Sequence, residues 1–257
     1  MSRRPRLGAA WDALGRTNAL GAILTRDGQL AEWDLEEFWA TGWEEVERFL
    51  KEVSLLAPSA RRGRAFDFGC GVGRISRALA EHCEAVTGVD VAESMVEQAR
   101  AMNADRPACT FILNRTPDLA QFPTAAFDLV YSRLVLQHIP PRLSRVYVAE
   151  LVRLLAPCGV LMFQLPQPDG SSRAVFTRAP VTGHPLKRLI PRPLVWLWRR
   201  MKYRLAVSSA DAWREIYGVP KSDVEAIVER AGGHLLAALP DCSHGVDGSG
   251  FEYWVAK

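Results

Sequence analysis

The sequence has little of what marks membrane-spanning, disulfide-linked or metal-binding proteins. It contains no apolar run of about 18 residues, roughly the length that a helix needs to cross a bilayer. Its basic start, Met1–Arg6, lacks the apolar core of a signal peptide. The five cysteines are odd in number and form no C-x-x-C pair, which argues against a disulfide framework and favours a reducing, cytoplasmic location. No group of His and acidic residues has ligand spacing, so we expect no metal site. A net charge of +3 is too small to indicate nucleic-acid binding by itself.

The chain instead carries a regular alternation of apolar runs and amphipathic segments. Its 48% apolar and 24% charged residues are ordinary for a globular protein. The pattern predicts strands at 64–69, 84–89, 109–113, 127–132 and 159–165, and helices at 73–82, 92–103 and 141–155. This β-α alternation predicts an α/β fold with a parallel, doubly wound sheet. A helix at 220–231 and strands at 234–240 and 250–256 are expected to complete it.

Residues 1–58 and 166–215 do not follow this alternation of strands and helices. Residues 1–33 are mixed in character, with turn signals at Gly8 and Gly15. Asp34 is a good N-cap, and apolar residues recur after it with helical spacing, so we expect a helix to begin there. The expected domain organisation is an N-terminal helical cap over 1–58 and a larger α/β domain over 59–257, with a lid-like insertion over 166–215.

The stretch Phe66-Asp-Phe-Gly-Cys-Gly-Val-Gly-Arg74 joins an expected strand to an expected helix through a glycine-rich turn. Glycines at 69, 71 and 73 allow positive φ angles and a close approach of the backbone to a ligand. The start of the next helix offers free N–H groups to an anion. Asp90 ends the next apolar run about 20 residues later, where an acid can accept both hydroxyls of a ribose. The pattern predicts a nucleoside-binding unit, and a tight turn without a ligand is the alternative.

The spacing of the glycines indicates which class of nucleoside cofactor the turn would bind. A dinucleotide fingerprint, G-x-G-x-x-G, would need a glycine where Arg74 stands. The pattern D-x-G-x-G-x-G, led by Asp67, instead resembles motif I of class I S-adenosylmethionine-dependent methyltransferases. The resemblance covers about residues 60–165 and 218–257. It implies a Rossmann-like, mostly parallel seven-stranded sheet with an antiparallel last strand, S-adenosyl-L-methionine as cofactor and S-adenosyl-L-homocysteine as product.

The resemblance also implies which residues bind the cofactor. The glycine turn is expected at its aminoacid end, Asp90 at the ribose, and Val91 and Met95 at the adenine. Asn114 stands where related enzymes usually have an acid for the adenine amino group, and Asp118 is the alternative. The expected cofactor-binding residues are Asp67, Gly69, Cys70, Gly71, Gly73, Arg74, Asp90, Val91, Met95, Asn114, Arg115, Thr116, Ser132, Arg133 and Leu134.

His138 and Tyr217 are the expected catalytic residues. In related enzymes a histidine at this place often lies at the floor of the substrate site, and a neutral imidazole can accept a proton as the methyl group moves. The alternative is a structural His138 that contacts only backbone groups of its turn. Tyr217 directly precedes the return of the chain to the core and, with Tyr203 and Trp213, is expected to line the acceptor site.

The segment 184–204 interleaves Lys and Arg with Leu, Trp and Tyr. Three interpretations are open: a solvated lid, a site for an anionic acceptor, and an amphipathic contact with a membrane surface. The predicted function is methyl transfer to a small-molecule acceptor that is anionic, lipid-like or a natural product. The alternatives are a non-catalytic module that binds the cofactor, a lipid methyltransferase at a membrane surface, and a nicotinamide-dependent reductase. No nucleic-acid partner is expected, and the sequence does not indicate the oligomeric state.

Overall fold

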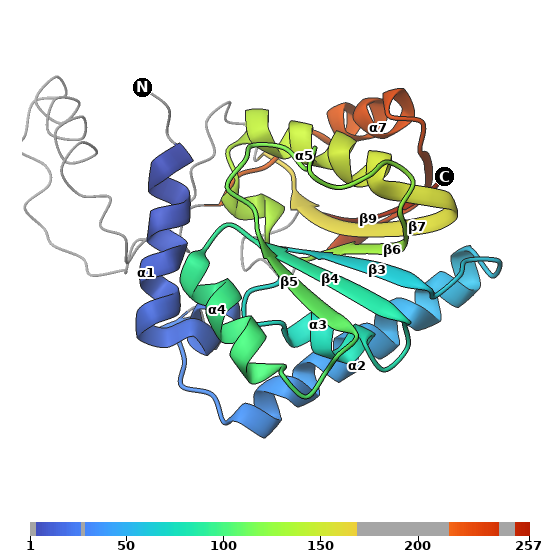
Figure 1. Ribbon diagram of the computed structural model, residues 1–257. Helices are drawn as coiled ribbons and strands as arrows, with labels where there is room; N and C mark the ends of the chain where they lie inside the picture. The colour runs from blue at the N-terminus through green and yellow to red at the C-terminus, as the bar shows by residue number, and fades with distance from the viewer. Residues whose placement is uncertain (1–3, 27–28, 169–215, 242–249) are drawn as a thin grey trace, which may run out of the picture.

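The computed structural model describes residues 4–26, 29–168, 216–241 and 250–257. Most of them build one seven-stranded sheet with helices on both faces (Figure 1). The strands of this sheet are β3 (Arg64–Phe68), β4 (Ala85–Asp90), β5 (Cys109–Leu113), β6 (Phe127–Ser132), β7 (Leu155–Pro166), β8 (His234–Asp241) and β9 (Gly250–Ala256). The helices are α1 (Arg4–Ile23), α2 (Leu35–Leu56), α3 (Arg74–Leu79), α4 (Glu93–Met102), the 3-10 turn η1 (Leu136–His138), α5 (Pro141–Leu154) and α7 (Lys221–Arg230). A small hairpin joins β1 (Thr25–Arg26) to β2 (Gln29–Leu30).

The strand order is β5-β4-β3-β6-β7-β9-β8. The first five strands run parallel, and β9 runs antiparallel to both of its neighbours. The predicted fold class is therefore confirmed, including the antiparallel last strand. Chain order reverses between β3 and β6, and ligands of such sheets bind beyond the carboxyl ends of the strands at this reversal.

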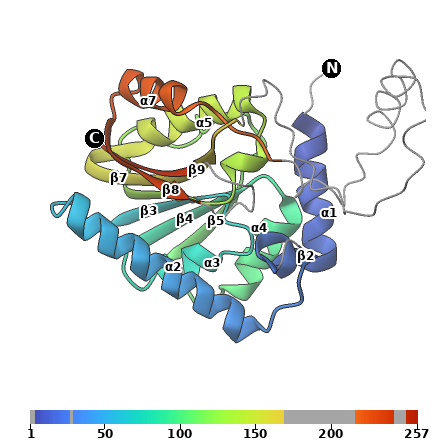
Figure 2. The same cartoon turned by 180° about the vertical axis from the view of Figure 1, so that it is seen from behind.

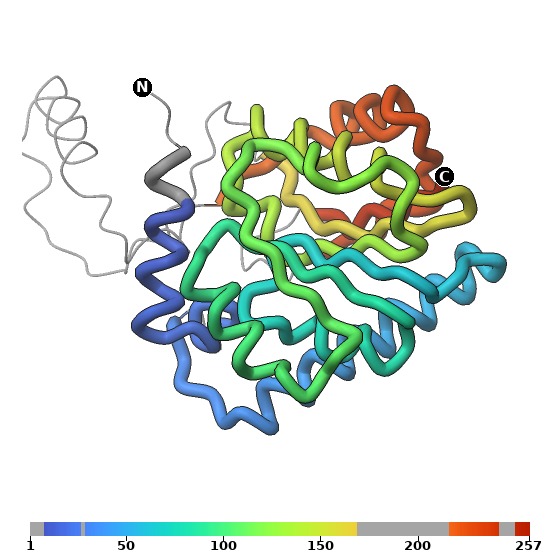
Figure 3. The backbone as a smooth tube through the Cα atoms, in the orientation of Figure 1, coloured from blue at the N-terminus to red at the C-terminus, as the bar shows by residue number. Residues whose placement is uncertain are grey.

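Helices cover the two faces of the sheet in separate groups. Helices α5 and α7 lie on one face, and α2, α3 and α4 lie on the other (Figures 1 and 2). Helix α1 packs against α4, beyond the end of the sheet (Figure 3). The carboxyl ends of β3 and β4 lead to α3 and α4, so α1 lies at the edge where a ligand is expected.

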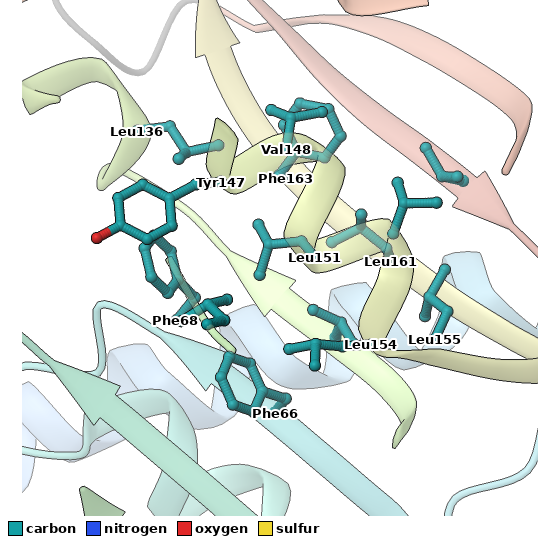
Figure 4. Packing of buried hydrophobic residues seen from close by; sticks show 14 of the residues in the cluster. Phe66, Phe68, Leu136, Tyr147, Val148, Leu151, Leu154, Leu155, Leu161 and Phe163 are labelled. Carbon is teal, nitrogen blue, oxygen red and sulfur yellow. The ribbon is translucent and has the colours of Figure 1, made fainter. Parts of the chain in front are cut away.

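The core on the α5 face is built from strand side chains and one side of α5 (Figure 4). The rings of Phe68 and Tyr147 lie 4.7 Å apart, and those of Phe66 and Phe122 lie 5.0 Å apart in an edge-to-face arrangement. Leu151 of α5 is completely buried among them. Burial of several large side chains, at about 25 cal/mol per Å² of apolar area, fixes α5 on the sheet.

Helix α2 begins where the sequence predicts. Oδ1 of Asp34 accepts the backbone N–H groups of Glu36 and Glu37 at 2.9 and 3.1 Å, which is the N-cap arrangement. Its apolar side packs against the sheet, where Phe49 stacks on Trp254 at 5.6 Å. Helix α2 thus contributes to the main core. Whether 1–58 and 59–257 behave as separate domains stays a prediction.

Helix α1 occupies most of residues 1–33, where the sequence pattern is mixed in character. Gly8 and Gly15 suggested turns, but both lie inside α1 and face the α4 region. A Cβ at Gly15 would lie 2.4 Å from Oγ of Ser94, so the absence of a side chain allows the two helices to approach. Asn18 interrupts the helix, with a φ of −155°, and its Oδ1 accepts the N–H of Gly21.

The central part of the insertion, including 184–204, Tyr203 and Trp213, lies outside the described residues. Among the described residues, no helix is both long and apolar enough to cross a membrane.

Candidate functional site

The glycine turn connects β3 to α3 with three positive φ angles: 78° at Gly69, 54° at Gly71 and 89° at Gly73. The N–H groups of Gly69 and Cys70 donate to the carbonyl oxygen of Val89, which ties the turn to β4. Space is also restricted, since a Cβ at Gly73 would lie 2.7 Å from the side-chain amide of Asn103. The sequence folds into this turn because glycine alone adopts such angles without strain.

Asp90 ends β4 directly beside the turn. Its Oδ2 accepts the N–H of Gly71 at 3.0 Å, and its Oδ1 accepts the N–H of Ala92 at 2.9 Å. Burial raises the pKa of Asp90, and these N–H groups oppose that shift. Each carboxylate oxygen has a further lone pair, so the side chain is still able to accept two ligand hydroxyls.

Asp67 lies on β3 and is buried. Its Oδ2 accepts the hydroxyl of Ser76 in α3 at 2.6 Å. Burial raises the pKa of Asp67 to about 7, although Ser76 and Arg74 oppose the shift. The contact with Ser76 joins the strand to the helix after the turn, which supports a role in orienting the turn.

The expected adenine side is formed by the start of α4 and the loop after β5. Val91 is 42% exposed, whereas Met95 is buried against α1. Oδ1 of Asn114 accepts from the Thr116 hydroxyl and from Gln121, and its Nδ2 donates to a carbonyl of the same loop. Asn114 therefore shapes the loop. Both lone pairs of this oxygen are thus engaged, so an adenine amino group would have to displace one of these donors.

Two arginines on the expected list have partners on the α2 face of the sheet. Arg74 pairs with Glu45 of α2 at 2.7 Å, and Arg133 lies 3.4 Å from the same carboxylate. Arg133 also lies 3.2 Å from Glu252 in β9, which accepts two bonds from Arg48 at 2.9 Å. Because both guanidinium groups pair with these acids, a role of Arg74 or Arg133 in cofactor binding would rest on their backbone groups. We call these five residues the Glu45 cluster.

Two neighbours of Arg133 shape the end of β6. The buried hydroxyl of Ser132 donates to the carbonyl oxygen of Phe68 at 3.2 Å, which joins β6 to β3. Leu134 has a φ of 60°, a left-handed conformation that is costly for a branched side chain. Val135 then packs over the glycine turn, because a Cβ at Gly69 would lie 2.3 Å from Cγ2 of Val135.

Helix α1 covers this region. Its last residue, Ile23, lies against the turn, since a Cβ at Gly71 would be 2.6 Å from Cδ1 of Ile23. Asp12 accepts the N–H of Ser94 at 2.7 Å, and the Ser94 hydroxyl donates back to the Asp12 carbonyl at 2.7 Å. The α4 N-cap, Ala92, has no capping side chain, so Asp12 supplies that function from a distant part of the chain.

The two expected catalytic residues lie at η1. The ring of Trp11 in α1 contacts His138 edge-on, with 5.1 Å between ring centroids. The backbone N–H of Tyr217 donates to the carbonyl oxygen of Gln137 at 2.6 Å. Nε2 of Gln137 lies 3.1 Å from Nε2 of His138, and Oε1 of Gln137 accepts from Gln164 at 3.3 Å. Gln137 and Gln164, both buried, are polar residues that motif spacing did not single out.

The carboxyl ends of β3, β4, β6 and β7 thus bring together the glycine turn, Asp90 and η1. A cradle with no room for side chains, followed by a carboxylate held by two N–H groups, fits a nucleoside with an aminoacid arm. Among the described residues, no group of three or more His, Cys, Asp or Glu side chains could hold a metal ion.

Comparisons with known proteins agree with this geometry. Residues 66–163 match the model of a methyltransferase domain. Over 192 residues the chain is 33% identical to trans-aconitate 2-methyltransferase of Methylobacterium radiotolerans, a match that covers 70% of this chain and 69% of the relative. Over 146 residues it is 33% identical to a ubiquinone biosynthesis O-methyltransferase of Paracidovorax citrulli, covering 55% of this chain and 60% of the relative.

A solved structure shares the fold at low identity. It is magnesium protoporphyrin IX methyltransferase from Synechocystis with bound S-adenosylhomocysteine, with a TM-score of 0.59 and 16% identity. The match covers 98% of each chain. Similarity therefore extends over the whole seven-stranded architecture.

Proposed function

Because the chain belongs to the class I S-adenosylmethionine-dependent methyltransferases, we propose that it methylates an oxygen of a small anionic acceptor, of the carboxylate class. The family and its cofactor follow from the domain match and the curated relatives. The protein is thus an enzyme and uses S-adenosylmethionine. The acceptor and the roles of individual residues are the proposal.

The cofactor supplies a methyl group on a positively charged sulfur, which is already a strong electrophile. In the proposal Asp90 accepts the ribose hydroxyls, and the glycine turn allows the aminoacid end to approach the backbone. Backbone carbonyls at Ser132 and Arg133 accept from the ammonium group. Val91 and Met95 contact the adenine. These residues bind and orient, and orientation of nucleophile and methyl group supplies most of the acceleration.

The observation that carries the choice of acceptor is the match to relatives named trans-aconitate 2-methyltransferase, at 33% and 31% identity. Trans-aconitate is a tricarboxylate. A carboxylate has a pKa near 4 and is ionised at neutral pH, so it attacks without losing a proton to the enzyme. The polar side chains at η1, close to the end of β7, support an acceptor with hydrogen-bonding oxygens.

A phenolic acceptor is the second candidate, favoured by the match to relatives named ubiquinone biosynthesis O-methyltransferase. A phenol has a pKa near 10 and needs a base. His138 is the residue at hand for that role, since it lies at η1 beside Tyr217. A phenolic acceptor would therefore require His138 as a base, whereas a carboxylate acceptor would not.

A product assay separates the candidates. The full chain is incubated with S-adenosylmethionine and, in turn, trans-aconitate, its saturated analogue tricarballylate, or a catechol, and S-adenosylhomocysteine is quantified by mass spectrometry. We expect release with a tricarboxylate, and a product that mild alkali hydrolyses, as a methyl ester does and a methyl ether does not. Asp90→Ala is the matched negative control. Turnover with the catechol alone would favour the second candidate, and cofactor binding without turnover of any acceptor would favour a non-catalytic module.

The basic segment 184–204 is proposed to contribute cations to the anionic acceptor, with a solvated lid and a membrane contact as alternatives. Liposome flotation at low salt tests the membrane contact. Cytoplasmic location is a prediction from the cysteine pattern.

A further inference from the structure

Glu45 of α2 joins two backbone segments that follow different strands of the sheet. Its Oε2 accepts from the guanidinium of Arg74 at 2.7 Å. Arg74 opens α3 directly after Gly73, the last glycine of the turn. Oε1 of Glu45 accepts the hydroxyl of Tyr131 in β6 and lies 3.4 Å from the guanidinium of Arg133. One carboxylate is therefore attached to the glycine turn on one side and to the end of β6 on the other.

The backbone at the end of β6 needs such support. Leu134, the residue after Arg133, has a φ of 60°, which is costly for a branched side chain. Conformations of this kind persist where the surrounding contacts hold them in place. On the other side of Arg133, the hydroxyl of Ser132 donates to the carbonyl oxygen of Phe68 and ties the backbone to β3. The side chain of Arg133 ties the middle of this short segment to α2.

Acids from three different elements hold Arg133. Besides Glu45, its guanidinium lies 3.2 Å from Glu252 of β9 and 3.6 Å from Asp241 of β8. The side chain is 18% exposed, so these ion pairs are largely shielded from water. The arginines of the Glu45 cluster are matched by an equal number of acids once Asp241 is included. Their charges are thus engaged within the protein, which suits support of the backbone better than capture of an anionic acceptor.

We propose that Glu45 and Arg133 are positioning residues that set the spacing between the glycine turn and the end of β6, and thereby the affinity for the aminoacid arm of the cofactor. In the proposed function this arm approaches the turn, and the carbonyl oxygens of Ser132 and Arg133 accept from its ammonium group. The two side chains act through the backbone that they hold. The inference rests on this part of the proposed function and does not depend on the acceptor.

A truncated ligand separates the aminoacid arm from the rest of the cofactor. S-adenosylhomocysteine has the arm, whereas 5′-methylthioadenosine retains the adenosine and the sulfur without it. Isothermal titration calorimetry of the full chain measures the affinity for each, and the wild type should bind S-adenosylhomocysteine more tightly. In Arg133→Met we expect about tenfold weaker binding of S-adenosylhomocysteine and less than about twofold weaker binding of 5′-methylthioadenosine.

Arg48→Met is the matched control. Arg48 pairs with the same Glu252, but it belongs to α2 and its side chain is 44% exposed. Its loss should leave both affinities within about twofold of the wild type. Arg133→Lys keeps the charge but lacks the planar fork that contacts several acids, so its affinity for S-adenosylhomocysteine should fall between those of the wild type and Arg133→Met. If Arg133→Met does not fold, wild-type affinities in Arg133→Lys would overturn the proposal.

Glu45→Gln tests whether one carboxylate serves both segments. Glutamine keeps the size and an accepting oxygen but loses the charge that pairs with both arginines. We expect a loss confined to S-adenosylhomocysteine, as in Arg133→Met. Combining the two changes should weaken binding by less than about threefold beyond the larger single effect, because both break the same bridge. Full additivity would overturn the shared bridge.

The pattern of affinities decides the inference. Equal losses for both ligands in Arg133→Met would overturn it, because the variant would then disturb the whole site, and unchanged affinities in the folded variant would overturn it too. If the wild type does not distinguish the two ligands, the placement of the arm in the proposed function fails, and the inference fails with it. If the wild type distinguishes them but methylates no tricarboxylate, the proposed acceptor fails, and the binding data still decide the roles of Glu45 and Arg133.

Discussion

The backbone N–H of Gly71 donates to Oδ2 of Asp90 at 3.0 Å, so the glycine turn and the acid at the end of β4 hold each other in place. The second oxygen of Asp90 accepts the N–H of Ala92. One side chain therefore shapes the turn and retains lone pairs for a ribose. Changes at either residue should affect cofactor binding more than folding.

Asp90→Ala is expected to weaken S-adenosylmethionine binding by about 2–3 kcal/mol, the range for losing a hydrogen-bonded charge. Isothermal titration calorimetry measures the affinity, and circular dichroism verifies the fold. Asp105→Ala is the control, because Asp105 pairs with Arg77 in an exposed position and should leave affinity unchanged. Wild-type affinity in a folded Asp90→Ala protein would remove Asp90 from the site.

Gly71→Ala and Gly232→Ala form a matched pair. Both glycines have positive φ, 54° and 82°, so alanine costs about 1 kcal/mol of strain at either position. A Cβ at Gly71 meets Ile23, whereas a Cβ at Gly232 meets nothing within 4 Å. Calorimetry should show at least about tenfold weaker cofactor binding for Gly71→Ala only. Equal affinities would argue that the turn does not contact the cofactor.

Asp12→Ala should loosen α1 from α4. The change removes a cap from α4, at about 1 kcal/mol, and frees the helix that covers the glycine turn. Hydrogen exchange followed by mass spectrometry should show faster exchange over α1. Asp34→Ala removes the cap of α2 and serves as the control, with no change at α1. Protection of α1 that is the same in both variants would contradict the assigned contact.

Glu45→Ala should destabilise the protein by about 3–5 kcal/mol, because it leaves the buried Arg74 without its carboxylate partner, whereas the partly buried Arg133 keeps Glu252. Burial opposes ionisation of Glu45, but Arg74 and Arg133 lower its pKa below the ordinary value. Urea unfolding measures the loss. Glu47→Ala, on the exposed side of α2, is the control and should change stability by less than about 1 kcal/mol. A small loss for Glu45→Ala would mean that water solvates the cluster.

Asp67 should make stability fall as pH rises. Burial raises its folded pKa to about 7 from the ordinary 3.8, so the folded chain keeps a proton that the unfolded chain releases. Its contribution is complete below about pH 4 and is lost as pH rises through about 7. Relative to Asp67→Asn, the wild type should lose up to about 4 kcal/mol between pH 4 and 8, measured by urea unfolding without cofactor. A difference that is constant with pH would contradict the shift.

Much of the fold could be predicted because its signals are local. From apolar runs and turn residues, the limits of β5, β6 and β9 were predicted as the structure has them, and Asp34 predicted the start of α2. The extent of α1 was not predicted, because Gly8 and Gly15 are unfavourable in an isolated helix. They are tolerated here since they allow α1 to approach α4, a contact between segments about 80 residues apart.

In the candidate site, too, the residues with local sequence signals could be predicted, and those that depend on contacts between distant segments could not. The glycine turn and Asp90 follow a spacing that sequence alone displays. The acidic partners of Arg74 and Arg133 follow no such spacing. Glu45 and Glu252 lie far apart in the sequence and come together only in the folded protein. Gln137 and Gln164 carry no motif either, and a buried glutamine on a strand shows its importance only through its contacts.

The position of β9 has a consequence for synthesis. It lies between β7 and β8 although it follows both in the chain. Until residues 250–256 are in place, the segment of β8 lacks the strand that pairs with it, and β7 has an open edge. Such an edge is a template for association with other chains. Closing the sheet therefore requires β9 to insert between two strands that precede it in the chain, and the newly made protein is most exposed to aggregation before this step.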